Sequence, residues 1–192
     1  KEILGVSASL IPFVEKNRVD RSLMACAMQK QAVPLLEQDN PVVGTGIERE
    51  IAKNTPQLVM ATGTGIVKKA DGKSIIVTYD KGGDKEYKLQ HFEKTNDDRC
   101  YNQRCVVVRG QKVKKGDALI EGASVHDGEL ALGRDLLVAF MPWRGYNMDD
   151  AIVISNRLVK DDTLTSINIQ DFDVEVRETK LGPEQVTRDI HL

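Results

Sequence analysis

The segment that decides the fold is residues 139–155, which read AFMPWRGYNMDDAIVIS. It contains the only tryptophan of the chain, together with a proline, a glycine and two adjacent carboxylates, Asp149 and Asp150. Apolar runs lie on both sides, at 136–141 and 151–154, and short apolar runs bounded by turn residues predict buried strands. The sequence therefore predicts an acidic loop that projects from a rigid core, as functional loops often do.

Asp149 and Asp150 admit two interpretations. Adjacent carboxylates repel each other, so they usually face a cation or a metal-bound ligand. The alternative is a solvated acidic turn that caps the next element. For a bare Asp-Asp pair the solvated turn is favoured, and the rest of the chain has to decide between the two.

Composition describes an ordinary soluble globular chain. Its 192 residues include 27 Lys and Arg against 29 Asp and Glu, which gives a net charge of −2. This balance excludes a protein whose whole surface binds a polyanion, although it permits a local basic patch. The apolar run 3–14 is interrupted by Pro12 and lacks a basic flank, so we expect no targeting or membrane segment. The first residue is Lys, which suggests a piece of a longer chain.

Three cysteines indicate free thiols in a reducing compartment. Cys100 and Cys105 lie near each other in sequence, but no second pair of Cys or His residues stands nearby to complete a zinc site. Partly buried, unpaired thiols are therefore the favoured interpretation, ahead of zinc.

The clearest helix is predicted at residues 17–32, with Asn17 or Asp20 as its cap and Pro34 ending it. One stripe of this helix carries Arg21, Met24, Met28 and Gln31 at helical spacing. Methionines on a helix usually fill a core, and spacing alone favours that interpretation. The alternative is that the arginine contacts phosphate while the methionines and the glutamine face an extended chain.

After a Gly44-x-Gly46 turn and a short helix, the pattern changes to strands. We expect an antiparallel meander with one polar face, made of strands at 57–61, 65–69, 74–79 and 85–91. A further strand is predicted at 105–108, a short helix at 156–162 and an alternating strand at 164–176. The fold class that follows is mainly β with a few helices (α+β).

The sequence VKKGDAL at residues 113–119 resembles the hairpin of barrel-sandwich hybrid domains, which include biotinyl and lipoyl carriers. Those carriers need an acceptor lysine at the hairpin tip. Lys112, Lys114 and Lys115 precede the Gly-Asp turn, and none of them occupies such a tip. A barrel-sandwich-like hairpin is therefore expected without carrier function.

Several motifs together resemble the β subunit, the second-largest subunit, of bacterial-type DNA-directed RNA polymerase. They follow the order of that family and spread over nearly the whole chain, at residues 9–13, 28–34, 127–133, 140–152 and 179–184. The resemblance implies a middle segment of the subunit that reaches the start of the flap. It implies a partial double-psi β-barrel, with the antiparallel meander and the barrel-sandwich-like hairpin added to it. The expected divisions are a helical active-site segment with a connecting loop at 1–54, a β-rich barrel core at 55–178 and the start of the flap at 179–192.

The same resemblance implies a role in one wall of the nucleotide and RNA cleft. It places Arg21 near the triphosphate of the incoming nucleotide, Met24 in the same active-site segment and Gln31 near RNA phosphates. Asp149 and Asp150 match a Glu-Asp pair near the second metal, as helpers and not as main metal ligands. The resemblance implies Mg²⁺ held mainly by the largest subunit, so this chain alone should not be active.

The implied partners are the largest (β′) subunit, the α subunits, sigma factor through the adjoining flap, template DNA, RNA and nucleoside triphosphates. The implied compartment is the bacterial cytoplasm, or an organelle for a plastid-type polymerase. Several positions depart from the family pattern. Asp149 stands where Glu is common, Asp20 replaces an Asn, and Ala25, Cys26, Ala27 and Lys30 stand where Gly, Ala, Asn and Arg are common. In the family this helix also lines the pocket for rifamycin-type inhibitors, and Ala27 lacks the Asn amide.

Two other functions remain open. In one, the chain is a non-catalytic β-barrel assembly module anchored by Trp143 and Tyr146; in the other, it is a biotinyl-type carrier. The polymerase interpretation predicts that Arg21 and the Asp149–Asp150 pair converge on one cleft.

Overall fold

A four-stranded antiparallel sheet forms one end of the protein, here called the sheet lobe. In this computed structural model, which describes residues 3–180 and 182–189, its strand order is β4-β3-β2-β8. The strands are β2 (Gly65–Ala70), β3 (Ser74–Tyr79), β4 (Gly83–Lys88) and β8 (Lys112–Val113). Local turns join β2, β3 and β4: the Asp71 carboxylate accepts hydrogen bonds from the backbone amides of Lys73 and Ser74, and Gly82 and Gly83 have positive φ where β4 begins. The predicted meander is thus confirmed for β2, β3 and β4.

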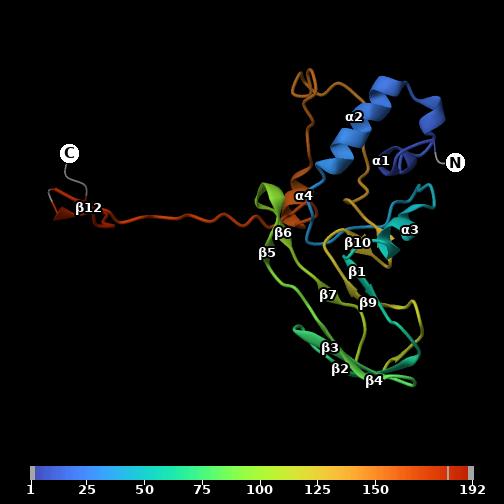
Figure 1. Cartoon of the computed structure of the whole chain (residues 1–192). Coiled ribbons are helices and arrows are strands. Elements are labelled where there is room, and N and C mark those ends of the chain that lie inside the picture. Colours follow the sequence, from blue (N-terminus) through green and yellow to red (C-terminus); the bar gives the residue numbers. More distant parts are fainter. Residues whose placement is uncertain (1–2, 181, 190–192) are drawn as a thin grey trace.

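A second sheet lies next to the sheet lobe and has the order β1-β9-β7 (Figure 1). Its strands are β1 (Leu58–Met60), β7 (Arg104–Cys105) and β9 (Ala118–Glu121). The predicted strand at 57–61 therefore pairs here and not in the meander. The Gly116-Asp117 turn joins β8 to β9, but these strands pair in different sheets. The expected hairpin is therefore a connection between the two sheets, because β8 pairs with β2 while β9 pairs with β1 and β7.

The core lies between the two sheets and is built from the apolar side chains of their strands; burial alternates along the start of β2, whereas Leu119 and Ile120 of β9 are both buried. Val67, Ile75, Val77, Leu119 and Ile120 are each at most 1% exposed. Burying such aliphatic side chains is the main favourable contribution to the stability of this region. Cys26, Cys100 and Cys105 are free, and Cys100 is buried, which confirms the prediction of partly buried thiols.

A buried charge joins β9 to its neighbours. Glu121 is 1% exposed, and its Oε2 accepts hydrogen bonds from Nε and Nη2 of Arg104 on β7, at 3.2 and 2.7 Å. Its Oε1 accepts one from the backbone N–H of Gly128 at 2.8 Å. Nη2 of Arg104 also lies 2.6 Å from Nδ1 of His126. The network holds the turn between β10 (Val125–His126) and β11 (Glu129–Leu130) against the second sheet.

The helices are short except for α2. They are α1 (Val6–Ser9), α2 (Val19–Lys30), α3 (Glu48–Lys53) and α4 (Asn156–Lys160), with 3-10 turns at Val14–Lys16 and Asn96–Asp98. The predicted helices at 17–32 and 156–162 are confirmed. The predicted cap of α2 is wrong, because Arg18 occupies the N-cap position and makes no side-chain cap bond, while Asp20 pairs with Arg18 at 3.1 Å.

The Gly44-x-Gly46 turn precedes α3, as expected, and it binds a side chain of its own helix. Oε1 of Glu48 accepts from the Thr45 N–H at 2.8 Å, and Oε2 accepts from the Gly46 N–H at 2.7 Å. Burial opposes ionisation of Glu48, but these backbone hydrogen bonds outweigh it and lower its pKa below the usual value. The backbone N–H groups of Thr45 and Gly46, which in a phosphate-binding loop would donate to the phosphate, here donate to the Glu48 carboxylate.

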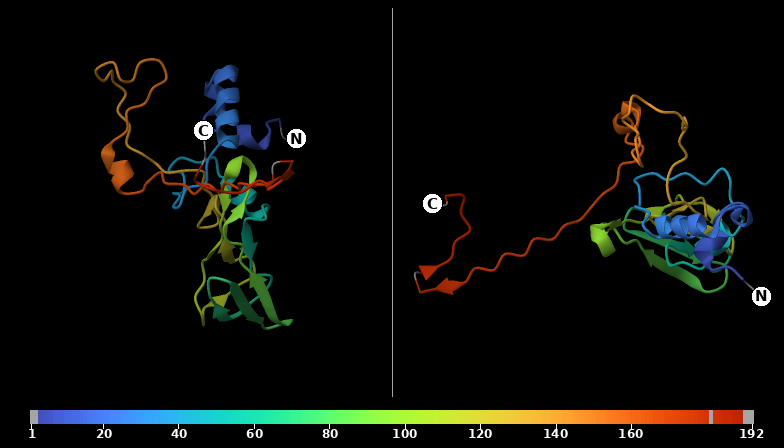
Figure 2. Two further views of the ribbon diagram at one scale, coloured as in Figure 1. Left: turned by 90° about the vertical axis from the view of Figure 1, so that its left-hand side faces the viewer. Right: turned by 90° about the horizontal axis from the view of Figure 1, so that it is seen from above.

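The remaining strands are two-residue pairs: β5 (Glu93–Lys94) with β6 (Cys100–Tyr101), and β12 (Glu178–Thr179) with β13 (Gly182–Pro183). The predicted strand at 164–176 is wrong, since only Asn168 forms a bridge, with Arg99, and the following residues extend away from the body as a tail (Figures 1 and 2). The strand predicted at 105–108 is wrong for residues 106–108, because β7 covers Arg104–Cys105 and shares only Cys105 with it. Residues 181 and 190–192 of the expected flap start lie outside the described residues.

The class mainly β with a few helices is confirmed. The double-psi barrel and the divisions after residues 54 and 178 stay predictions.

Candidate functional site

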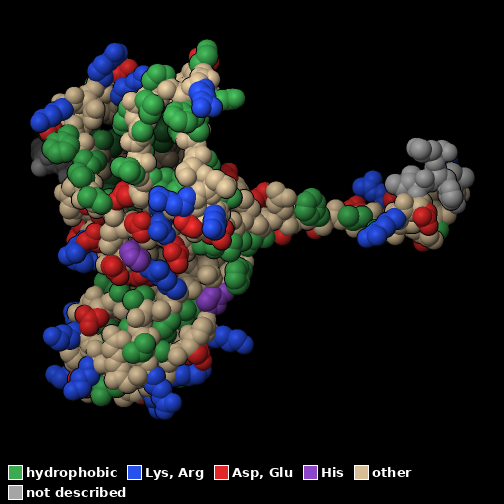
Figure 3. Space-filling model, turned by 180° about the vertical axis from the view of Figure 1, so that it is seen from behind, with side chains coloured by type: hydrophobic (Ala, Val, Ile, Leu, Met, Phe, Trp, Pro, Cys, Tyr) green, Lys and Arg blue, Asp and Glu red, His purple; other side chains and the backbone are tan. Residues whose placement is uncertain are grey.

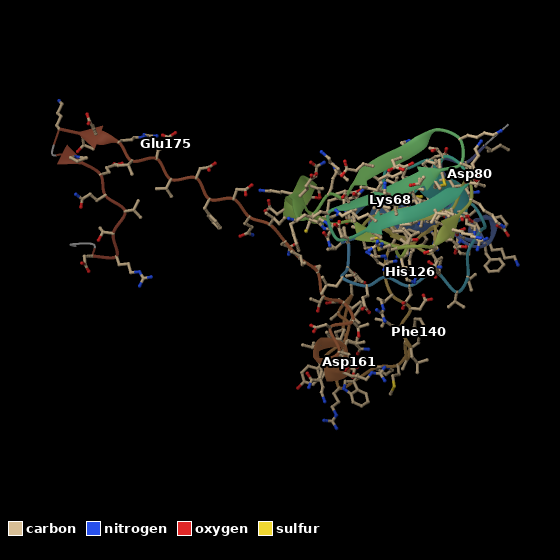
Figure 4. The ribbon with its side chains drawn as sticks, turned by 90° about the horizontal axis from the view of Figure 1, so that it is seen from below. Lys68, Asp80, His126, Phe140, Asp161 and Glu175 are labelled. Atoms are coloured by element: carbon tan, nitrogen blue, oxygen red, sulfur yellow. The ribbon has the colours of Figure 1, made fainter. Side chains whose placement is uncertain are left out.

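Residues 136–154 form a long exposed excursion, here called the arm. The two apolar runs that were predicted as buried strands contain no strand, and Leu137, Phe140 and Ile152 are 102%, 98% and 84% exposed. The prediction of buried strands is therefore wrong for this chain. The runs have the composition that requires burial, but among the described residues no backbone hydrogen bond pairs them with another strand. Figure 4 shows Phe140 on the arm, away from the sheet that carries Lys68.

The tip of the arm is a turn held by its own residues. Oδ1 of Asn147 accepts a hydrogen bond from the Trp143 N–H at 2.9 Å, and its Nδ2 donates to the Met141 carbonyl at 2.7 Å. The Tyr146 N–H donates to the Trp143 carbonyl at 2.9 Å. The guanidinium carbon of Arg144 lies 5.8 Å from the centroid of the Trp143 ring, a cation–π contact. The tip thus has a defined shape although the limbs of the arm are unpaired.

Asp149 and Asp150 follow this turn directly and are both exposed. Asp149 adopts a φ of 55°, in the left-handed region, which is uncommon for residues other than glycine. Neither carboxylate caps the next helix: the cap of α4 is Ser155, whose Oγ accepts from the Arg157 N–H. In the part of the chain that the structure describes, neither side chain forms a hydrogen bond or ion pair. The solvated-turn alternative is therefore correct about exposure and wrong about capping.

The stripe on α2 faces solvent. Met24 and Met28 are 50% and 64% exposed, so the core-filling interpretation is wrong. Nη1 of Arg21 lies 3.6 Å from the Met24 sulfur, and the guanidinium remains on the exposed surface. Gln31 is the C-cap residue of α2.

Sequence reasoning missed Arg99, which fixes the end of α2. Its Nη1 donates to the Ala32 carbonyl at 2.9 Å and its Nη2 to the Gln31 carbonyl at 3.0 Å. Its backbone forms the bridge with Asn168, just after the arm and α4. A cation at the end of a helix is favourable because the last carbonyls carry partial negative charge. A single Arg in a polar stretch gave no signal for this role in the sequence.

The segment that contains the arm and α4 is held at both of its ends by the same short stretch of backbone. Before the arm, the Asp39 N–H donates to the Gly133 carbonyl at 2.9 Å. After α4, the Leu36 N–H donates to the Thr165 carbonyl at 3.0 Å. We call this strip, residues 36–39, the arm base. Together with Arg99, it places the end of α2 and both ends of the excursion next to each other.

The arm and α2 project from the same end of the protein, opposite the sheet lobe (Figure 1). The turned view in Figure 2 shows them standing side by side with a separation. Among the described residues, no hydrogen bond or ion pair joins the tip of the arm to α2. The convergence of Arg21 with Asp149 and Asp150 on one cleft stays a prediction.

Figure 3 shows many hydrophobic side chains on the surface of the end that carries α2 and the arm, with Lys and Arg side chains at both ends of the molecule. A cavity of about 700 Å³ lies between the N-terminal residues and α3; Ile3, Leu4, Ile47 and Ile51 are among the residues that line it. The candidate residues are not part of this cavity. Within the described ranges, no group of three or more His, Cys, Asp or Glu side chains could hold a metal ion, and no helix has the length and apolar character needed to span a membrane.

The chain is similar to known proteins over nearly its whole length. The family described as RNA polymerase Rpb2, domain 6, matches residues 60–192. A protein named DNA-directed RNA polymerase subunit beta from Nitratidesulfovibrio vulgaris (strain DP4) is 50% identical over 195 residues, covering 98% of this chain and 14% of the relative. The proteins of the same name from Chloroflexus aggregans and Caldicellulosiruptor saccharolyticus are 52% and 50% identical, each over 190 residues, covering 99% of this chain and 16% of the relative. The chain thus spans about a seventh of the length of these relatives.

Proposed function

Because the chain belongs to the family of RNA polymerase Rpb2, domain 6, we propose that it is part of the catalytic core of a DNA-directed RNA polymerase. In this proposal it forms one wall of the cleft that holds the nucleotide and the RNA during DNA-templated synthesis. The observation that carries the proposal is that the arm and the Arg21 stripe of α2 are both exposed at the same end of the protein. Apolar side chains exposed in such numbers at one end indicate partners that cover them.

Arg21 binds the triphosphate in this proposal. Its guanidinium is exposed and offers several donors in a planar fork, which suits phosphate oxygens. Met24, in contact with Arg21, limits where the guanidinium can lie. Gln31 offers its side-chain amide to RNA phosphates, since Arg99 binds only its backbone carbonyl.

Asp149 and Asp150 assist the Mg²⁺ that accompanies the nucleotide. Their carboxylate oxygens are the hard ligands that Mg²⁺ prefers, and both are exposed without an internal partner among the described residues, so the donor set fits a helping role. The ion, when bound, neutralises charge on the triphosphate. The main ligands belong to the largest subunit in this proposal, and the carboxylates of this chain orient the ion and its water shell.

The apolar limbs of the arm are covered by other parts of the enzyme. Exposed runs such as 136–141 and 151–154 are suited to complete a β-barrel with further segments of the parent subunit. Other partners in this proposal are the largest subunit, the α subunits, sigma factor, template DNA and RNA, in the bacterial cytoplasm or in an organelle.

The test uses polymerase reconstituted with a full subunit that carries this chain. Arg21→Ala should raise the KM for nucleotides about tenfold or more, since a charge-assisted hydrogen bond contributes about 1.5–3 kcal/mol. Arg18→Ala is the matched control: it removes an exposed arginine from the start of the same helix, one that already pairs with Asp20, and should leave KM unchanged. An unchanged KM in Arg21→Ala would contradict the proposed contact.

A second candidate is a non-catalytic assembly module. The half-exposed ring of Trp143 and the exposed ring of Tyr146 favour it, because aromatic side chains of this kind anchor protein interfaces. In that case Trp143→Ala should reduce incorporation of the subunit into the complex. Arg21→Ala should then disturb only assembly and leave KM unchanged.

A further inference from the structure

Asn147 closes the tip of the arm across its two limbs. Its amide bonds to the backbone of Trp143 and of Met141, both on the limb that enters the tip, while Asn147 itself begins the limb that leaves. Both groups of the amide are used, one as acceptor and one as donor. The side chain thus takes the place of the ladder hydrogen bonds that join the two strands of a hairpin.

The residues between Asn147 and the carboxylates continue the same turn. The Met148 N–H donates to the Gly145 carbonyl at 3.4 Å, and the Ala151 N–H donates to the Met148 carbonyl at 3.2 Å. Arg144 and Asp149 both adopt left-handed φ, 50° and 55°, which costs free energy for residues with a Cβ. The hydrogen bonds of Asn147 offset that cost at Arg144, because Arg144 lies between the bonded residues Trp143 and Asn147. They also tie the start of the limb that carries Asp149 and Asp150 to the limb that enters the tip.

We propose that Asn147 is a positioning residue that presents Asp149 and Asp150 in a fixed direction from the arm. This rests on the proposed function, in which those carboxylates assist the nucleotide-bound Mg²⁺. Without the amide, the left-handed conformation of Arg144 relaxes and the limb that carries the two carboxylates is no longer tied to the entering limb, so the carboxylates sample many directions. An Asp at this position would keep the acceptor for the Trp143 N–H and lose the donor to Met141. A Gln would place the same groups one methylene further out.

The first experiment measures the conformation of the tip directly. Trp143 is the only tryptophan of the chain, so its fluorescence in the 192-residue protein reports the tip alone. Asn147→Ala should shift the Trp143 emission and increase its quenching by acrylamide, with unchanged far-UV circular dichroism, and Asn147→Asp should give an intermediate change. The matched control is Asn156→Ala, which removes an Asn from the first position of α4. Unchanged Trp143 fluorescence in Asn147→Ala would overturn the inference at once.

The second experiment tests whether Asn147 affects the Mg²⁺ dependence of the enzyme through Asp149 and Asp150. In reconstituted polymerase, Asn147→Ala should raise the Mg²⁺ concentration for half-maximal activity about tenfold, since small displacements of positioned groups have large effects. Asp149→Asn with Asp150→Asn should do the same. Adding Asn147→Ala to that pair should cause no further loss, because the group that it positions is already absent.

The outcomes distinguish failure of the positioning role of Asn147 from failure of the proposed function of Asp149 and Asp150. If the Asp149 and Asp150 variants alter the Mg²⁺ dependence and Asn147→Ala does not, the positioning role is overturned and the proposed function stands. Additive losses would likewise overturn it, since Asn147 would then act independently of the carboxylates. If the Asp variants have no effect at all, the proposed role of the arm fails and the inference fails with it.

Discussion

Replacing Arg104 with Met removes the cation that neutralises a buried carboxylate. Glu121 is 1% exposed and lies directly opposite Arg104 in the β7–β9 register. Its two oxygens accept three hydrogen bonds, two from Arg104 and one from Gly128. The methionine side chain has a similar length to the arginine stem and can cover the same apolar surface, so the variant tests the charge more than the packing.

The expected loss follows from the difference in exposure of the two partners. Breaking a buried ion pair by removing one member costs about 3–5 kcal/mol, because an uncompensated charge stays in the interior. The Arg104 side chain is 44% exposed, so water weakens its interaction and the expected loss in unfolding free energy falls to about 2–3 kcal/mol. Replacing both residues, as Arg104→Met with Glu121→Leu, removes the buried charge and leaves the Gly128 N–H without its acceptor and the partly exposed His126 ring without its contact to Arg104. That variant should lose about 1 kcal/mol.

The assay is urea denaturation of the 192-residue chain, followed by far-UV circular dichroism. The control is Lys68→Met. It removes the ion pair between Lys68 and Asp84 on the surface of the sheet lobe, which has the same 2.7 Å distance as the pair between Arg104 and Glu121. Its unfolding free energy should equal that of the wild type within experimental error. The decisive comparison is the order of the variants, with the single Arg104 variant less stable than the double. If Arg104→Met has the same unfolding free energy as the wild type, the reasoning is refuted, because the buried Glu121 carboxylate would then be stable without the charge of Arg104.

Three further predictions follow from close contacts in the structure. Gly65→Ala should lower the unfolding free energy measurably in urea, because a Cβ there would lie 2.4 Å from the Thr78 carbonyl oxygen on β3, whereas Gly72→Ala meets nothing within 4 Å and should not. Glu48→Gln should be less stable than the wild type above pH 4.5, with the difference shrinking as pH falls through the lowered pKa of Glu48, since its ionised form is the one that the turn binds; a difference independent of pH would contradict this. Arg99→Ala should speed hydrogen exchange in the last turn of α2 and leave β3 unchanged, because it removes two donors to the carbonyls at that helix end.

Sequence alone predicted the elements whose signals are local. The helix at α2 follows from periodicity and from Pro34, and the β2–β4 meander follows from alternation and turn residues. The short helix at α4 was found in the same way. Each of these elements is determined by residues within a few positions of each other, so their patterns could be read without a partner.

The features that sequence missed depend on distant contacts. The apolar runs of the arm indicated a need for burial, but a pattern of hydrophobic residues does not say which segment buries them. The role of Arg99 depends on carbonyls 67 and 68 positions earlier in the chain. The candidate site residues Arg21, Asp149 and Asp150 came from a resemblance to the polymerase family, because periodicity alone favoured a core helix and a solvated turn. Asn147, which organises the tip, carries no signature beyond being an Asn near a Gly.

Between the neighbouring strands β1 and β9 the chain enters the sheet lobe twice: first as β2, β3 and β4, and again as β8, after β7 has joined the second sheet. β1 enters it and β9 leaves it side by side, with the Ala61 N–H bonded to the Asp117 carbonyl and the Gly116 N–H bonded to the Ala61 carbonyl at the junction. The β2–β4 hairpins connect neighbours in sequence, so we expect this part of the lobe to form early during folding, whereas β8 pairs with β2 from far along the chain. Once β8 has paired with β2, the end of β1 lies next to the start of β9, which removes most of the entropy cost of closing so long a loop. We therefore expect the sheet lobe to form before the second sheet, with the pairing of β8 and β2 as the step that links them.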